Sequence, residues 1–239
     1  MAGPWPALYL DDAEAVIASD LHIGLEDQRE LMGIHIPRTT FPQILEQVLT
    51  PIKHYNAKRI FLLGDVKHEF GRPSEPEWWG VKKLVKSIRE IGCEPEVVRG
   101  NHDNYIISVL SDLGVKVHDP TLSLTDSECV LMHGHEALST LEIIRPRILI
   151  MGHEHPSIAI RDDLGVRHRY KIFLSGQLDA PHVIVLPSSS PFAFGSNMNE
   201  LSPKHRLSPI LKNRDLSEMI PYLLEIGITV KEFPRMKYF

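Results

Sequence analysis

Side chains that can bind a metal ion or move a proton follow directly after five apolar runs of this sequence. The third of these places is Arg99-Gly100-Asn101-His102-Asp103, which comes after Val97-Val98. Gly100 allows the chain to turn sharply, and the turn then presents an amide oxygen, an imidazole and a carboxylate in succession. Taken alone, such a stretch is more often an ordinary strand-to-helix turn with Asn101 or Asp103 as the N-cap. The other four places decide between these interpretations.

Each of the other apolar runs also ends in potential ligands. The runs cover 15–18, 59–63, 129–132 and 148–151, and they are followed by Asp20 and His22, by Asp65, by His133, and by His153 and His155, respectively. Residues two apart in an extended segment point to the same face, so the members of the first and last pairs can converge on one ion. Each pattern alone has an ordinary explanation, namely a capping Asp beside a chance His, or a solvent-facing His-x-His turn.

The repetition of this pattern at five strand ends argues against chance. In α/β sheets, ligands bind outside the carboxyl ends of the strands, so these loops are expected to meet at one edge. Seven candidate ligands exceed what one ion needs and suit two ions that share a carboxylate. Carboxylate oxygen mixed with imidazole nitrogen points to Mn, Fe, Zn, Co or Ni rather than to calcium or thiolate-bound copper. The seven residues are Asp20, His22, Asp65, Asn101, His133, His153 and His155.

The elements that must position these residues alternate between apolar runs and helical patterns. Helical spacing of apolar residues predicts helices over 39–54, 78–92 and 104–113. A short apolar run that ends at Pro187 predicts a late strand over 183–186. The segment 187–216 is rich in Ser, Pro and Asn, which predicts a long loop that acts as a lid or as a dimer arm. A short helix over 217–226 and a strand over 228–230 are expected to follow. We therefore predict a single α/β domain over 1–239, with 187–239 as a C-terminal loop and helix-strand extension.

Composition excludes several classes of protein. The chain of 239 residues has 43% hydrophobic and 24% charged residues and a net charge of -5, which argues against a strongly cationic nucleic-acid binder but not against a local basic groove. No apolar run reaches 18 residues and no signal-peptide pattern opens the sequence, so no membrane association is expected. The two distant cysteines, Cys93 and Cys129, predict buried, reduced thiols and a cytoplasmic protein.

Taken together and in order, the motifs resemble those of the calcineurin-like metallophosphoesterases. The resemblance covers roughly residues 15 to 190 and rests on Ser19-Asp20-Leu21-His22, Gly64-Asp65, Gly100-Asn101-His102-Asp103, His133-Gly134 and Gly152-His153-Glu154-His155. The stretches 64–70 and 152–156 further resemble the SbcD-related phosphoesterases of archaea. Many members of the family carry Asp, Asn or Arg where this chain has His68, which puts the surroundings of the ligands in doubt rather than the ligands. The roles of His68, for which we favour support of a ligand, and of His135 stay open.

The resemblance implies a fold and a set of roles. The fold is a four-layer α-β-β-α sandwich of two mixed sheets flanked by helices, the metallo-dependent phosphatase-like architecture. Asp20, His22, Asp65 and His155 would hold one ion, and Asp65, Asn101, His133 and His153 the other, with Asp65 bridging. Of the metals that suit these donors, we expect two Mn²⁺ ions. His102 would stabilise the transition state and protonate the leaving group, and Asp103 would orient its ring.

The predicted activity is that of a dinuclear metal-dependent phosphoesterase. The mechanism expected is in-line attack on phosphorus by a hydroxide that two metal ions activate. A phosphodiester hydrolase acting on DNA or RNA is the leading hypothesis, because basic side chains could line a groove for the backbone. Those residues are Arg145, Arg147, Arg161, Arg167, Arg169, Lys171, Lys204 and Arg206. A solvated basic surface explains them equally well.

A small-molecule phosphodiesterase or phosphomonoesterase is the alternative, and a metal-free scaffold of the same fold is a third, less favoured one. A homodimer is among the expected assemblies.

Overall fold

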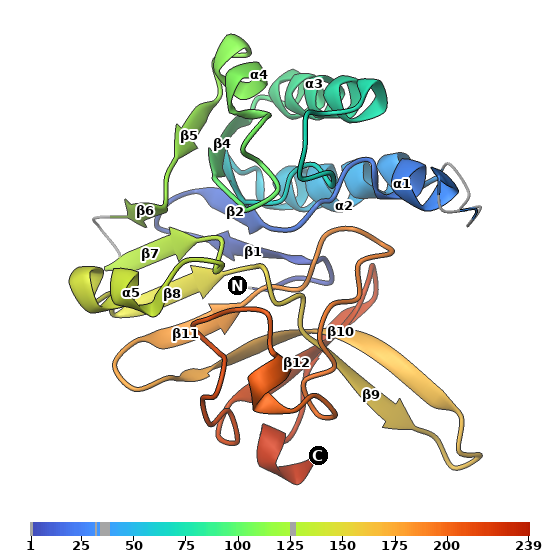
Figure 1. Cartoon of the computed structure of the whole chain (residues 1–239), viewed down its shortest axis with the longest axis vertical. Coiled ribbons are helices and arrows are strands. Elements are labelled where there is room, and N and C mark those ends of the chain that lie inside the picture. Colours follow the sequence, from blue (N-terminus) through green and yellow to red (C-terminus); the bar gives the residue numbers. More distant parts are fainter. Residues whose placement is uncertain (1, 32, 34–38, 125–127) are drawn as a thin grey trace.

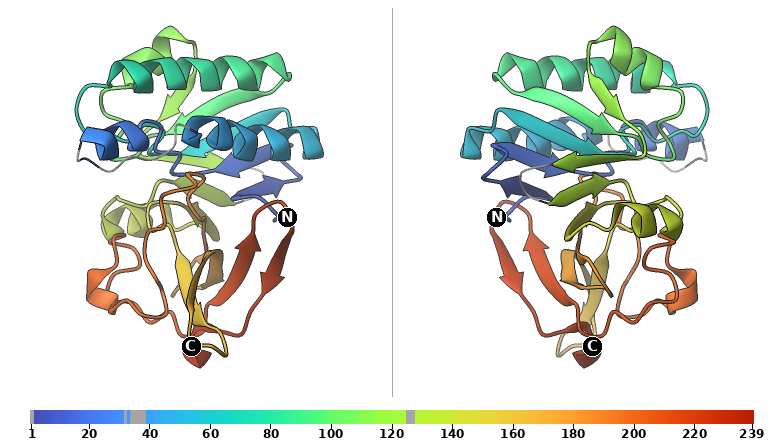
Figure 2. Two further views of the ribbon diagram at one scale, coloured as in Figure 1. Left: turned by 90° about the vertical axis from the view of Figure 1, so that its right-hand side faces the viewer. Right: turned by 90° about the vertical axis from the view of Figure 1, so that its left-hand side faces the viewer.

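Two β-sheets packed face to face form the centre of the structure, a computed structural model that describes residues 2–31, 33, 39–124 and 128–239. Figure 1 shows helices on the outer side of one sheet, and Figure 2 shows the second sheet beneath the first from two further sides. The predicted α/β class and its two sheets are confirmed. Among the described residues, none of the helices combines the length and apolar character that crossing a membrane requires.

The first sheet is mostly parallel and carries three of the five predicted strand ends. Its strands, in spatial order, are β1 (Ala7–Leu10), β2 (Ala15–Ala18), β3 (Arg59–Leu63), β4 (Glu94–Val98) and β5 (Lys116–His118), with only β1 antiparallel to its neighbour. The helices of its outer layer are α1 (Leu25–Leu31), α2 (Thr40–Tyr55), α3 (Glu75–Glu90) and α4 (Ile107–Asp112). Helix α3 begins earlier than predicted because Ser74 and Glu77 form a capping box at its first turn.

The second sheet is mixed and supplies the other two strand ends. Its path is β13 (Thr229–Glu232), β12 (Ile220–Glu225), β10 (Arg167–Gln177), β11 (His182–Val185), β8 (Ile148–Met151), β7 (Cys129–Met132) and β6 (Thr121–Leu124), while β9 (Ser157–Arg161) pairs with β10. Its outer layer holds one helix, α5 (Leu138–Ile144), the short 3₁₀ turn Pro203–His205 and irregular chain. A second 3₁₀ turn, Met236–Tyr238, lies near the C-terminus. The fourth layer of the predicted sandwich is therefore present but mainly irregular.

Alternation of side chains along the strands builds the cores. In β2, Ile17 packs into the cluster shared by the two sheets, whereas Val16 packs against the helices. The same alternation places Phe61 of β3 between the sheets and Ile60 beneath the helices. Because both faces of the first sheet are covered, β2 and β3 are apolar at nearly every position, and each forms a continuous apolar run in the sequence.

The short helix predicted over 217–226 is wrong, because this stretch forms strand β12. It pairs antiparallel with β10, placing Leu174 opposite Pro221, and then with β13, which confirms the terminal strand. The backbone N–H and C=O groups along one edge of β10 need hydrogen-bond partners. They find them in β12, which is distant from β10 in the sequence. The ten residues of the predicted helix had apolar spacing compatible with either element, so the tertiary pairing decided.

Candidate metal centre and active site

The loops that follow five strands converge at one edge of the two sheets and hold unusual backbone conformations. Five of the seven predicted ligands have positive φ angles, namely Asp20 at 55°, His22 at 47°, Asp65 at 50°, His153 at 67° and His155 at 45°. Residues other than glycine rarely adopt this conformation, and such strain concentrates at functional sites. Backbone hydrogen bonds between the loops hold it in place, for example from Asp20 N–H to Gly64 O at 3.1 Å and from His22 N–H to Asp65 O at 2.9 Å.

Asp20, His22 and His155 form the first cluster of potential ligand atoms. His155 Nε2 lies 3.0 Å from Asp20 Oδ1 and 3.3 Å from His22 Nε2. Asp20 also accepts the backbone N–H of His153 at 3.0 Å, which orients its carboxylate. The loops after β2 and β8, from different sheets, thus supply one site.

Asp65, His133 and His153 form the second cluster, with Asn101 beside it. His133 Nε2 is the central atom, lying 3.3 Å from Asp65 Oδ2, 3.1 Å from His153 Nδ1 and 3.1 Å from Asn101 Oδ1. Asp65 joins the two clusters, because the same Oδ2 lies 4.0 Å from His22 Nε2 of the first. All seven residues predicted as ligands therefore lie together.

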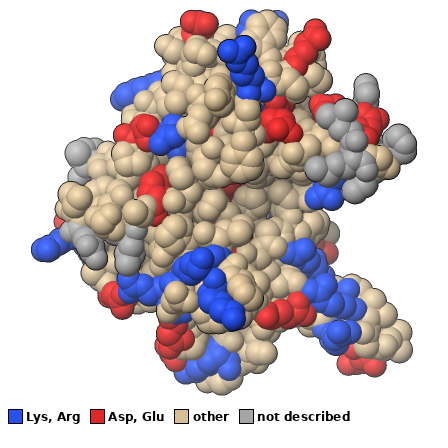
Figure 3. Space-filling model, viewed as in Figure 1, with Lys and Arg blue, Asp and Glu red and all other residues tan. Residues whose placement is uncertain are grey.

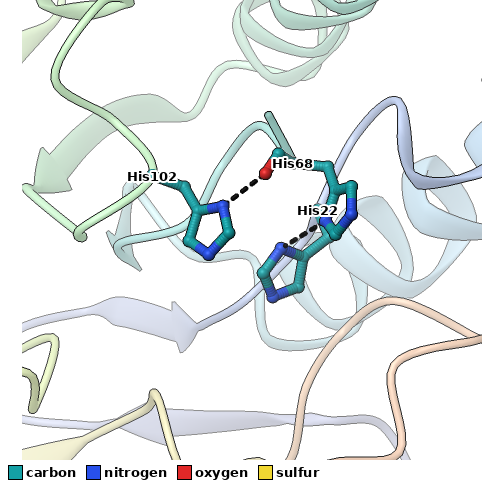
Figure 4. Close-up of side chains that lie close together, drawn as sticks. All are labelled: His22, His68 and His102. Atoms are coloured by element: carbon teal, nitrogen blue, oxygen red, sulfur yellow. Dashed lines mark hydrogen bonds between the residues drawn. The ribbon is translucent and has the colours of Figure 1, made fainter. Parts of the chain in front are cut away.

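The proton positions assigned by the hydrogen-bond partners leave lone pairs directed into the clusters. His133 donates its Nδ1–H to Leu63 O at 2.8 Å, which leaves Nε2 as a free acceptor. His68 donates from Nε2 to Gln28 Oε1 at 2.5 Å, so its Nδ1 can accept from His22 Nδ1 at 3.3 Å, and the Nε2 of His22 is left as a lone pair (Figure 4). His68 therefore lies behind a predicted ligand, the arrangement that fixes a metal-binding imidazole.

The donor set fits divalent cations. Ligand atoms about 2.0–2.1 Å from an ion lie about 3 Å from one another when they are adjacent in its coordination sphere. The spacings of 3.0–3.3 Å from His155 to Asp20 and His22, and of 3.1 Å from His133 to His153 and Asn101, match this. Acceptor atoms facing one another at such distances repel unless a cation or a proton lies between them.

The pKa values in the site reflect a competition between burial and the charges of neighbouring residues. Burial opposes ionisation of Asp20, but His155 and His133 outweigh it and lower the pKa of that carboxyl to about 2. Burial, and next the charge of His133, lower the pKa of His153 to about 4, which keeps its ring neutral. Burial also lowers the pKa of His133, but Asp65 and Asp20 outweigh it and raise that pKa to about 10. The raised pKa of His133 shows that the two carboxylates attract positive charge to this point, which a bound cation would supply.

His102 points its Nε2 into the same space. This atom lies 3.7 Å from Asp65 Oδ2, while Nδ1 donates to the carbonyl oxygen of His68 (Figure 4). The ring of Phe70 stacks on the imidazole with centroids 3.7 Å apart. The backbone N–H of His102 donates to Asp65 Oδ1 at 3.0 Å. The ring is therefore held by the chain at residues 68–70.

The expectation that Asp103 orients the ring of His102 is wrong. Asp103 is buried, and its two oxygens accept the backbone N–H groups of Val66 at 3.0 Å and of Gly100 at 2.9 Å. It therefore fastens the loop after β4 to the loop after β3. Asp103 follows His102 in sequence, but in this turn successive side chains point in different directions. The carboxylate of Asp103 therefore points away from the ring of His102.

Sequence reasoning missed two kinds of supporting residue. A Cβ atom on Gly64 would lie 2.5 Å from His133 Nδ1, so this glycine lets the loop approach the ligand. Glu154, between two predicted ligands, is fully buried and accepts the backbone N–H groups of Leu207 at 3.2 Å and Ser208 at 2.8 Å. The glycines before Asp65, Asn101 and His153 and the charged residue inside His-x-His were the available signals.

His135, whose role was open, lies beside the second cluster. Its ring centroid is 5.2 Å from that of His133, and burial, then the charges of His133 and Arg99, lower its pKa to about 4. His135 is therefore a neutral neighbour of the predicted ligands and is not a member of either ligand cluster.

Comparisons with known proteins find partial sequence similarity and a similar fold. No family model matches the chain. A phosphodiesterase of Escherichia coli strain K12, YfcE, is 27% identical over 118 residues, which are 48% of this chain and 63% of that protein. The match thus spans somewhat under two thirds of the length of the curated relative. Among solved structures, the crystal structure of Pseudomonas putida nuclease MPE superposes with a TM-score of 0.66 at 21% identity, covering 95% of this chain and 92% of the other.

These findings concern the family at large, and the SbcD-related branch stays a prediction. The chain therefore has the fold of the calcineurin-like metallophosphoesterases and carries their ordered motifs, which confirms the family resemblance predicted from its sequence.

Proposed function

We propose that this protein is a metal-dependent phosphodiesterase. The observation that carries the proposal is the pair of ligand clusters, Asp20–His22–His155 and Asp65–His133–His153, joined by the carboxylate of Asp65. The similarity to a protein named phosphodiesterase supports the reaction class. Phosphodiester hydrolysis needs a site that attracts an anion, supplies a nucleophile and protonates a leaving group, and the residues meet each need.

Two divalent ions would be held here, with Asp65 contributing to both. We propose Asp20, His22 and His155 as the remaining ligands of one ion, and Asn101, His133 and His153 as those of the other; Mn²⁺ is the proposed metal, with Fe, Zn, Co and Ni as alternatives that suit the same donors. Such a pair of ions, when bound, lowers the pKa of water and polarises a phosphoryl oxygen. Asp20 and Asp65 contribute only two negative charges, so they leave a dinuclear site net positive toward a phosphate anion.

His102 is the proposed general acid. The carbonyl of His68 fixes its Nδ1 proton, so Nε2 faces the site and can deliver a proton to the leaving oxygen. Phe70 covers one face of the ring and limits its rotation. General acid catalysis of this kind contributes on the order of 10²–10⁴ in rate when the leaving group is poor.

The test compares two leaving groups. His102→Ala is expected to lower kcat/KM about 10²–10⁴-fold on a diester with an alkyl leaving group, and far less on a 4-nitrophenyl diester that needs no protonation. Equal losses on both substrates would refute the acid role. Asp65→Asn is the matched control, because it removes the shared carboxylate and should abolish turnover of both. Fewer than one transition metal per chain after Mn²⁺ supplementation would favour a scaffold instead.

Nucleic acid is the substrate class that we propose. The register of the β9–β10 hairpin places Arg161, Arg167 and Arg169 on one face, and Figure 3 shows Lys and Arg gathered at the lower right over this hairpin. One structural neighbour is named a nuclease. Hydrolysis of single-stranded DNA or RNA with Mn²⁺, compared with that of 2′,3′-cyclic nucleotides, tests this choice against a small-molecule substrate.

The basic groove expected from the sequence is smaller than predicted. Lys171 and Arg206 are buried and donate to carbonyl oxygens, so they do not line a surface. Arg147 precedes β8, at the end of that strand opposite to His153, and pairs with Glu128. Of the predicted groove cations, Arg169 lines a cavity beside His22 and His155, and Arg29 lines it as well.

We also propose that the chain acts as one phosphoesterase domain in the cytoplasm. The two cysteines support a reducing compartment, because both are free and buried.

A further inference from the structure

We propose that Phe192 and Phe194 form a stacking platform for an unpaired nucleobase beside the phosphodiester to be cleaved. This inference rests on the proposed function and names the form of nucleic acid that the site accepts. It follows from a cavity, from the aromatic rings around it, from the cations that hold those rings and from the charge of its lining.

A cavity of about 450 Å³ opens directly on the first ligand cluster. His22, His102 and His155 line its inner side, and residues 192–195 line its outer side. Helix α1 closes a third side with Leu25 and Arg29. This volume lies within the range of sites for small ligands, so a single nucleotide next to the reacting phosphate fits it.

Exposed phenylalanine rings gather around this cavity. Among the described residues, four phenylalanines are substantially exposed, and three of them lie here: Phe192 at 38%, Phe194 at 37% and Phe70 at 59%, the last stacked on His102. Phe61 and Phe173, in contrast, are fully buried between the sheets. Three exposed rings beside one site are available for contact with a flat apolar group, and a nucleobase presents such a face.

Two basic side chains, the partly exposed Arg169 and the buried Lys171, hold the platform in position. Arg169 donates to the carbonyl oxygens of Phe194 and Gly195 and to Ser157 Oγ at 3.1 Å. Lys171, 5% exposed, donates to Ser188 O at 2.6 Å and to Ser190 O. The charged groups of both side chains also lie near the Phe194 ring, at 5.3 and 5.5 Å from its centroid.

The segment 192–195 also packs closely against the loop that carries His155. A Cβ atom on Gly195 would lie 2.3 Å from the Cβ of His155. The segment 188–195 is thus held in one arrangement against the site, which limits the conformational entropy lost when a base binds. These contacts favour a pre-organised platform over the lid or dimer arm expected from its Ser and Pro content.

The charge of the cavity matches a polyanion. Among the described residues that line it, the fixed charges are those of Arg29 and Arg169, and none is acidic. Arg161 and Arg167 continue this face outward along the hairpin, where Arg167 forms an ion pair with Glu200 at 2.5 Å. Phosphates on either side of a stacked base can therefore meet guanidinium groups. A base inside a duplex has both faces covered by its neighbours, so the platform selects an unpaired strand.

The experiment compares two oligonucleotides with the same phosphate charge. One is single-stranded and carries its bases, and the other is the abasic analogue of equal length. The Michaelis constant KM is measured from hydrolysis, and the dissociation constant Kd from fluorescence anisotropy with Ca²⁺. In the wild type, both constants are expected to be about 5- to 150-fold lower for the base-bearing strand, which is the effect of one stacked base. The double variant Phe192→Ala/Phe194→Ala should bring this ratio close to one.

Phe239→Ala is the matched control, because that ring is 43% exposed and lies at the C-terminus; it should leave the ratio unchanged. A wild type that binds both strands equally, or a double variant that keeps the wild-type ratio, would overturn the platform. Equal affinity for the base-bearing strand and its duplex would overturn the selection of unpaired bases. Absence of hydrolysis of every ester would refute the proposed function, whereas the Kd ratio would still test the platform.

Discussion

Replacing Gly100 by alanine tests whether direct contact between the loops after β3 and β4 sets the geometry of the site. A Cβ atom on Gly100 would lie 2.3 Å from both the backbone nitrogen and Oδ1 of Asp65. Ordinary contacts of a Cβ atom begin at 3.4 Å, so the loops would have to separate by about 1 Å. The carboxylate that joins the two clusters would then move away from Asn101 and from the backbone N–H of His102.

A displacement of this size is expected to lower kcat/KM by on the order of 10²-fold. Overpacking should also reduce the free energy of unfolding by about 1–3 kcal/mol, which corresponds to about 2–4 °C in Tm for each kcal/mol in a protein of this length. The assay is hydrolysis of a 4-nitrophenyl diester over a titration with Mn²⁺, beside a thermal melt of the same samples. More Mn²⁺ should be needed for half-maximal activity, because the shared ligand is displaced.

Gly71→Ala is the control for this variant. A Cβ atom on Gly71 meets nothing within 4 Å, so the same substitution there should change neither activity nor Tm. If Gly100→Ala keeps the wild-type kcat/KM and the wild-type requirement for Mn²⁺, the contact between the loops does not determine the site, and the reasoning from glycine to geometry fails.

Three further outcomes follow from buried polar groups. Glu154→Gln removes the charge that two backbone amides share and should destabilise the fold by about 1–3 kcal/mol in urea denaturation; an unchanged midpoint would contradict this. Burial first, and then Arg169, lower the pKa of Lys171 to about 7 from its usual 10.5. Between these values the folded state binds fewer protons than the unfolded state, so the free energy of unfolding should rise from pH 7 toward pH 10.5, and this rise should be smaller in Lys171→Met. Cys93 and Cys129, whose thiol pKa values burial raises to about 12 and about 11, should react with a thiol reagent at pH 8 only after unfolding.

The ligand set could be predicted from the sequence because each part of it is local. An apolar run followed by a polar residue signals a strand that ends at a sheet edge, and the rule that such ends meet brought Asp20, Asp65 and His133 together without coordinates. The partners of His102 could not be predicted in this way. The carbonyl of His68 and the ring of Phe70 reach it through space from another loop, and Asp103, its neighbour in sequence, bonds elsewhere.

The C-terminal part of the chain shows the same limit on a larger scale. The spacing of apolar residues around Leu223 allows a helix or a strand, and pairing with Phe173 and its neighbours in β10 selects the strand. The Ser- and Pro-rich segment before it has no periodicity to interpret. Its position depends on Lys171, a residue that the sequence placed on a basic surface and that the structure buries.

The sequence by itself thus determined which side chains could bind metal, the order of the strands that carry them and the family to which they point. These properties depend on residue type and on periodicity over a few positions, and both can be read from neighbours in the chain. The tertiary structure alone decided which nitrogen of each histidine faces the site, what orients His102 and where residues 188–195 lie. Each of these depends on hydrogen bonds and packing between segments distant in sequence, and a buried polar group takes its partner from whatever the fold brings near.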